Sequence, residues 1–159
     1  MILLSVGTQL PFDRLISIMD DLAPNIPEPV YGQIGFGKYV PRNFEFSSAI
    51  APAEFEERFR GADVIVSHAG IGTILTAQRH EKPIILFPRR ARYGEHRNDH
   101  QLATCRNLGG TPGIYVAYNE EELRKLIESK EGLQPASIGS SPERDQLIAS
   151  LRQFLQLPS

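Results

Sequence analysis

The fold is decided by one stretch, residues 63–101, which reads DVIVSHAGIGTILTAQRHEKPIILFPRRARYGEHRNDHQ. An apolar run at 64–66 ends in a polar turn that holds two glycines, and a helical segment follows to about His80. A second apolar run at 84–87 is stopped by Pro88. This order predicts a strand, a glycine turn, a helix and a second, parallel strand, which together make one βαβ unit.

The glycine turn is typical of an anion site. Gly70 and Gly72 let the backbone bend sharply and let a ligand approach where a Cβ atom would clash. Thr73 lies where the helix is expected to begin, and a helix start offers unpaired N–H groups and the positive end of the helix dipole. His68 lies at the edge where open parallel sheets bind ligands; the alternative is a structural histidine. Phosphate is the expected ligand.

The composition is that of an ordinary globular domain. The 159 residues suffice for one domain with a sizeable core, and 41% hydrophobic and 23% charged residues are usual values. A formal net charge of -2 gives no electrostatic case for binding nucleic acid. Cys105 is the single cysteine, so an intrachain disulfide is excluded and a reducing compartment fits. We expect it to be a small buried residue rather than a nucleophile.

The first residues read as a strand rather than as a targeting segment. The apolar run at 2–6 has no basic region before it, unlike a secretory signal peptide. No apolar run approaches the roughly 20 residues that span a bilayer. We therefore expect a cytoplasmic chain that meets a membrane only through a partner or a surface face.

Strand and helix patterns alternate along the chain. Strands are predicted at 1–6, 30–35, 43–50, 64–66, 84–87 and 114–117, and helices at 12–22, 53–59, 73–80, 98–108, 120–129 and 142–155. The alternation predicts an α/β fold, a Rossmann-like doubly wound parallel sheet of about six strands in a single domain. A connector at 131–141, rich in Gly, Pro and Ser, leads to the last helix, which is expected to pack on the domain or on a partner.

Three blocks of the sequence resemble the glycosyltransferase family 28 C-terminal domain, the donor-binding half of GT-B glycosyltransferases. They are residues 5–8 with 12–16, residues 62–75, and residues 98–101, and the resemblance extends over residues 1–130. Within the family, the chain is most similar to short stand-alone subunits. These include the soluble subunit of the N-acetylglucosamine transferase of dolichol-linked oligosaccharide synthesis, and bacterial exopolysaccharide and capsule subunits that share the block at 94–101.

The resemblance implies a donor-binding subunit of a two-component inverting glycosyltransferase. Such a subunit binds a UDP-sugar, and the pair adds a hexose to a lipid-linked saccharide in exopolysaccharide or capsule biosynthesis. A membrane-anchored partner would bind the acceptor, supply the general base and recruit the chain to the inner face of the membrane. No metal and no cofactor are implied, because a helix N-terminus and a cation take their place.

The alternative function is a non-catalytic nucleotide-sugar-binding module that regulates or scaffolds polysaccharide assembly. A dehydrogenase-like binder is disfavoured, because the first strand is not followed by a G-x-G-x-x-G fingerprint. The glycines around Gly35 lie after the second strand and have the wrong spacing for that fingerprint. We interpret them as a loop at the sheet edge.

The resemblance also implies a set of donor contacts. Asp99 and Gln101 would hold sugar hydroxyls, the loop at 50–51 would meet uracil, and His68 is the candidate catalytic residue. The full expected set is Gly7, Thr8, Ile50, Ala51, His68, Ala69, Gly70, Gly72, Thr73, Arg89, Glu95, Asp99, His100 and Gln101.

One position departs from the family pattern. Relatives place a glutamate eight residues after the histidine, where it holds the ribose hydroxyls, and here that position is Thr76. Either Glu95 or another carboxylate takes over the ribose contact, or the ribose is held differently.

The loop that follows the second strand of the unit allows two further interpretations. Its four arginines form either a solvated surface or a group in which one arginine pairs with the diphosphate or an anionic acceptor. His96 and His100, spaced by one helical turn, would permit a metal site beside Asp99, a less favoured interpretation.

Overall fold

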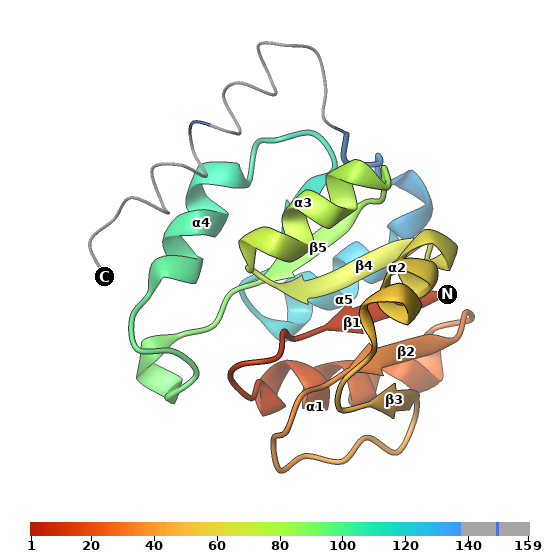
Figure 1. Cartoon of the computed structure of the whole chain (residues 1–159). Coiled ribbons are helices and arrows are strands. Elements are labelled where there is room, and N and C mark those ends of the chain that lie inside the picture. Colours follow the sequence, from red (N-terminus) through yellow and green to blue (C-terminus); the bar gives the residue numbers. More distant parts are fainter. Residues whose placement is uncertain (138–148, 150–159) are drawn as a thin grey trace.

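The computed structural model of the chain describes residues 1–137 and residue 149. Six strands form one sheet in the order β3-β2-β1-β4-β5-β6, and every neighbouring pair is parallel (Figure 1). The strands are β1 (Ile2–Ser5), β2 (Val30–Gln33), β3 (Glu45–Ser47), β4 (Val64–His68), β5 (Ile84–Phe87) and β6 (Ile114–Val116). The predicted doubly wound α/β fold is confirmed. The connector from residue 138 onward and the predicted helix at 142–155 lie outside the described residues, residue 149 excepted.

Within residues 1–137, five α-helices and three short 3-10 helices accompany the strands. The α-helices are α1 (Asp13–Leu22), α2 (Pro52–Gly61), α3 (Ile71–Arg79), α4 (His100–Leu108) and α5 (Glu120–Glu128). The 3-10 helices are η1 (Ala23–Asn25), η2 (Ala91–Tyr93) and η3 (Lys130–Gly132). None of the helices in the described part of the chain combines the length and the apolar composition that a membrane span requires.

Both faces of the sheet are buried along β1, β4 and β5, because apolar side chains dominate these strands instead of alternating with polar ones, whereas the edge strand β3 is largely exposed. Ile2 and Leu4 of β1 pack with α1 and α5 on one face. Leu3 of the same strand packs on the opposite face with α2, α3 and α4. Cys105 lies in this second layer, 1% exposed, and burial raises the pKa of its thiol to about 12. It is a buried apolar contact, as predicted.

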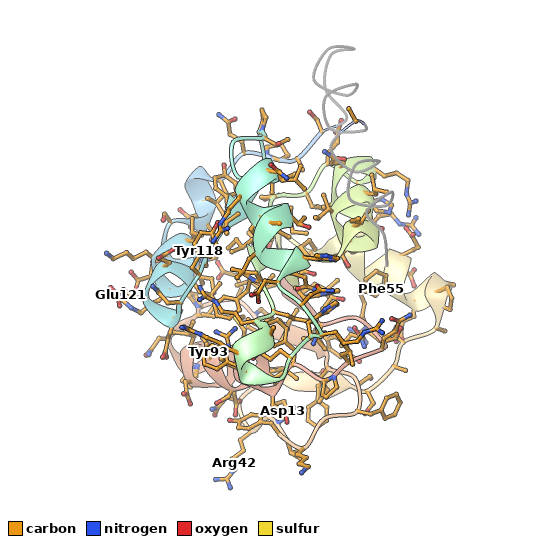
Figure 2. All side chains as sticks on the ribbon, turned by 90° about the vertical axis from the view of Figure 1, so that its left-hand side faces the viewer. Asp13, Arg42, Phe55, Tyr93, Tyr118 and Glu121 are labelled. Carbon is orange, nitrogen blue, oxygen red and sulfur yellow. The ribbon has the colours of Figure 1, made fainter. Side chains whose placement is uncertain are left out.

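The strand order creates a crevice at the carboxyl edge of the sheet. From β1 the chain proceeds outward through β2 and β3, then returns to β4 on the other side of β1. The loops that follow β1 and β4 therefore diverge, which is where open α/β sheets bind ligands. β1 runs leftward from the N-terminus in Figure 1, so Figure 2, which faces the left-hand side, looks onto this edge.

A buried carboxylate fixes the loop between β2 and β3. Asp20 of α1 is 2% exposed and accepts hydrogen bonds from the Tyr39 hydroxyl (2.7 Å) and the backbone N–H groups of Asn43 (2.7 Å) and Arg42 (3.0 Å). Burial alone would raise the pKa of Asp20, but these hydrogen bonds outweigh burial and hold it below its ordinary value. The loop is therefore tied to the helix at several points.

We expect Asp20→Asn to lower the free energy of unfolding by about 1–3 kcal/mol, because the amide nitrogen cannot accept the donors that face it. The folded-state pKa of Asp20 is depressed, so its contribution is complete above the unfolded pKa of about 3.9 and is lost as pH falls through the folded pKa. Urea titrations at about pH 7 and about pH 3 measure this. Asp21→Asn, at an exposed neighbour, is the control. If Asp20→Asn lowers the free energy of unfolding by the same amount at both pH values, the depressed pKa of Asp20 is contradicted.

Candidate functional site

An open cleft of about 410 Å³ lies at the crevice between the loops that follow β1 and β4. Its lining consists of Val6, Gly7, Thr8, Gln9, Leu10, His68, Gly70, Gly72, Thr73, Arg89, His96 and Gln101. Larger hollows of about 690 Å³ beside Asp20 and about 520 Å³ beside Leu22 lie away from the crevice and contain no glycine turn. Eight of the residues predicted from sequence meet in the cleft, namely Gly7, Thr8, His68, Gly70, Gly72, Thr73, Arg89 and Gln101.

The first turn of α3 borders the cleft. The helix begins at Ile71, two residues before the expected start at Thr73, and Gly70 precedes it in an extended conformation. No side chain caps this end of the helix. The first N–H groups therefore remain without intrahelical partners, and the positive end of the helix dipole lies at the cleft.

The imidazole of His68 is packed between two glycines. A Cβ atom on Gly70 would lie 2.3 Å from Cε1 of the ring, and one on Gly7 would lie 2.9 Å from Nε2. Gly7 also has φ +79°, a conformation that favours glycine. Both glycines are thus required where they stand because the ring occupies the space of a side chain.

His68 is neutral at physiological pH. Burial lowers the pKa of its imidazole to about 3, and the nearby positive charge of Arg89 and the ring of His96 act in the same direction. Nδ1 of the ring lies 3.2 Å from Nε2 of Gln101. His68 therefore reaches the cleft as an uncharged group.

Arg89 is a buried cation that shapes the cleft. It is 2% exposed, and its guanidinium donates to the carbonyl oxygens of Pro11 (2.7 Å), Leu10 (2.9 Å) and Val6. Burial lowers the pKa of Arg89 to about 10, with Glu95 acting in the opposite direction, so the group stays charged at neutral pH. Its hydrogen bonds fix the loop that follows β1, and its charge makes the cleft positive.

The structure does not bring Glu95 into the cleft. Its carboxylate makes a two-pronged ion pair with Arg14, at 2.8 and 2.9 Å, and accepts the backbone N–H of Arg90 at 2.9 Å. Thr76 offers no substitute carboxylate, and its hydroxyl donates to the Gly72 carbonyl at 2.8 Å. The interpretation of Glu95 as the ribose contact is therefore not supported, because Arg14 already occupies both oxygens.

Five other predicted residues also lie outside the cleft lining. Asp99 precedes α4 and accepts the backbone N–H of Ala91 at 2.9 Å, while His100 is exposed as the first residue of that helix. Ala69 is buried beside the cleft, and its N–H donates to Gln101. The loop at 50–51 lies before α2, where Ile50 packs on the second core layer.

The arginine-rich loop divides into two kinds of residue. Arg92 and Arg97 are exposed, as the solvated interpretation predicts, whereas Arg89 is buried and bonded to backbone carbonyls. In the described part of the chain, no three His, Cys, Asp or Glu side chains form a cluster that would hold a metal ion.

The predicted set of site residues missed four residues of the cleft, namely Val6, Gln9, Leu10 and His96. Gln9 and Leu10 line the cleft because they lie in the loop that follows β1. Their position after a predicted central strand could have identified them from the sequence. His96 also lines the cleft, and its buried Nδ1 has no hydrogen-bond partner among the described residues. Burial lowers the pKa of His96, so this ring too favours the neutral form.

The fold and the cleft define a Rossmann-like domain whose glycine turn and helix N-terminus are arranged to hold an anion. The sequence profile of the glycosyltransferase family 28 C-terminal domain matches residues 1–143. The chain belongs to this family, and the resemblance noted from its motifs is confirmed. A sequence search of curated proteins found no match.

Three solved structures illustrate the shared fold. ALG13, determined by NMR in solution, gives a TM-score of 0.62 at 18% identity over 94% of each chain. MurG from Acinetobacter baumannii gives 0.59 at 16% identity over 99% of this chain and 45% of its own. The glycosyltransferase SsfS6 from Streptomyces sp. SF2575, solved with thymidine diphosphate, gives 0.53 at 18% identity over 99% of this chain and 37% of its own. The chain thus spans less than half of the length of the latter two.

The two glycines of the turn give a matched pair of substitutions. We expect Gly70→Ala to lower the free energy of unfolding by about 1–3 kcal/mol, because the new methyl group overlaps the His68 ring. Gly72→Ala meets nothing within 4 Å and lies inside α3, so it should be neutral or stabilise by up to about 1 kcal/mol. Urea denaturation measures both. Equal effects of the two substitutions would show that His68 does not occupy this space.

Proposed function

We propose that the chain is the donor-binding subunit of a two-component inverting glycosyltransferase. It binds a UDP-sugar in the cleft, and with a membrane-anchored partner it transfers a hexose to a lipid-linked saccharide of exopolysaccharide or capsule synthesis. One observation carries the proposal: the N-terminus of α3 and the charged Arg89 meet in one cleft whose described lining holds no carboxylate. This electrostatic environment favours a diphosphate.

The proposed role of the cleft is to stabilise the leaving group. When the bond between sugar and diphosphate breaks, negative charge grows on the phosphate oxygen that leaves. Free N–H groups of α3, the hydroxyl of Thr73 and the positive charge of Arg89 would act on that charge from fixed positions. Because these groups are already in place, the mechanism needs no metal ion.

The proposed mechanism takes its general base from the partner. A direct displacement requires a group that accepts the proton of the acceptor hydroxyl. No carboxylate occurs among the described residues that line the cleft, and His68 has a pKa of about 3, too low for efficient proton abstraction at neutral pH. His68 would therefore act on the donor and not as the base.

Exposed apolar side chains support a protein partner at the carboxyl edge. The loops around the cleft expose large apolar side chains, namely Phe36 (77% exposed), Tyr93 (52%) and Leu10 (41%). Figure 2 shows Tyr93 on the face that looks along the carboxyl ends of the strands. Exposed apolar groups around a polar cleft are typical of interfaces.

The substrate and pathway rest on the sequence resemblance. The block at 94–101 resembles subunits of bacterial exopolysaccharide and capsule transferases, which supports a hexose donor and a lipid-linked acceptor. Uracil as the base rests on the same resemblance. A non-catalytic nucleotide-sugar-binding module would share the cleft, and transfer by the reconstituted pair separates the two functions.

Calorimetric titration of the chain with UDP, ADP and NAD tests donor binding. We expect selective binding of UDP with a dissociation constant of about 0.1–1 mM. Thr73→Ala removes a hydroxyl at the cleft and should weaken binding about tenfold, which is roughly 1.4 kcal/mol. Thr111→Ala, in the turn before β6, removes the same group at the other end of the sheet and should leave binding unchanged. Equal affinity for the three ligands would contradict the proposed donor.

The partner is tested by reconstitution with the membrane-anchored subunit. Transfer to a lipid-linked acceptor should require both chains, and Phe36→Ser should weaken their association about tenfold or more without changing the affinity for UDP. Leu75→Ser, which removes another exposed apolar side chain from α3, is the control. Robust transfer by this chain alone would overturn the two-component arrangement, and UDP binding without transfer by the pair would favour the non-catalytic module.

A further inference from the structure

The side-chain amide of Gln101 is held at both ends. Its Oε1 accepts the backbone N–H of Ala69 at 3.2 Å and that of Arg89 at 3.0 Å. Its Nε2 lies 3.2 Å from Nδ1 of His68. The side chain is only 9% exposed, so these contacts dominate its environment. Gln101 thus links the residues that follow β4 and β5 to the imidazole.

The chemistry of the amide fixes its orientation. An amide has an acceptor end and a donor end, and the two backbone N–H groups need the acceptor. The opposite orientation would place the amide donors of Gln101 against these N–H donors and leave buried groups without partners. The NH₂ group therefore faces His68, and Nδ1 of His68 must accept.

This orientation decides where the proton of His68 lies. The ring is neutral, because burial lowers its pKa to about 3 and Arg89 opposes a second charge. A neutral imidazole carries one proton, and Nδ1 is occupied as an acceptor, so the proton is on Nε2. Nε2 points toward Gly7, a lining residue of the cleft, where a Cβ atom would lie 2.9 Å from it.

We propose that Gln101 is a positioning residue that fixes His68 in the Nε2-protonated tautomer, so that His68 meets the bound diphosphate as a neutral hydrogen-bond donor. The identity of the anion as a diphosphate rests on the proposed function. The tautomer of His68 rests on the hydrogen bonds of Gln101 alone and is independent of that function. This role differs from the contact with sugar hydroxyls that the family resemblance implies, because Gln101 here acts through the imidazole.

The substitution Gln101→Glu removes the hydrogen-bond donor of the side chain and keeps an acceptor. The introduced carboxylate keeps an oxygen for the two backbone N–H groups, but it can no longer donate to His68. It accepts instead, and the proton of the neutral ring should move to Nδ1. Gln134→Glu, at an exposed position outside the cleft, adds the same charge and should leave His68 unchanged.

Long-range ¹H–¹⁵N NMR of the full chain reads the tautomer directly. We expect His68 of the wild type to be protonated on Nε2 alone from about pH 6 to about pH 8, and to be protonated on Nδ1 in Gln101→Glu at about pH 8. A wild-type ring protonated on Nδ1, or one that exchanges between both forms, would overturn the proposal. An unchanged tautomer in Gln101→Glu would do the same.

Binding of UDP tests the consequence for the ligand. UDP carries no transferable sugar, so a direct contact of Gln101 with that sugar plays no part. We expect Gln101→Glu to weaken UDP binding at least about tenfold in the wild type and by a clearly smaller factor in the His68→Ala background. Losses of equal size in both backgrounds would show that Gln101 acts without His68. If the wild type binds no UDP, the proposed function fails, while the NMR result still decides the tautomer.

Discussion

One buried cation holds together the carboxyl edge of the sheet. Beyond the last ladder bond, the backbone groups of parallel strands lose their strand partners, and buried groups without partners are unfavourable. Arg89 supplies donors to the carbonyls of Val6, Leu10 and Pro11, so that the loop after the central strand folds back onto the sheet. The planar guanidinium, with five donors, suits this task better than an ammonium group. One wall of the cleft depends on this contact.

The same contact sets the electrostatics of the cleft. Arg89 remains charged, and its charge together with burial keeps His68 neutral. The acid that would neutralise Arg89, Glu95, is instead bound at both oxygens by Arg14, whose guanidinium also lies 4.7 Å from the centre of the Phe87 ring. The positive charge of Arg89 is thus left to act on the cleft. An anion there gains a stabilising field and meets no carboxylate among the described lining residues.

The sequence predicted the fold and the glycine turn because both are local. Apolar runs bounded by glycine and proline predict buried strands, and the turn at 70–73 is contiguous in sequence. The role of Glu95 was not predictable in this way, because its partner Arg14 lies 81 residues away. Proximity in a motif suggested Glu95 as a ligand contact, whereas the structure pairs it with Arg14 outside the cleft lining. The same reasoning did not predict that Arg89 bonds to carbonyls 78 to 83 residues away. Long-range pairing of charged side chains leaves no periodic signal.

The two tasks of the proposed transfer make opposite demands on charge. A cleft that stabilises a departing diphosphate must be positive, whereas a general base must be an unprotonated group of sufficient pKa. A carboxylate placed beside Arg89 would have its pKa lowered and would repel the diphosphate, so it would serve neither task. The base therefore belongs on a separate element that approaches the acceptor side. The apolar rim that includes Phe36 and Leu10 supports such an approach in the proposed two-component reaction.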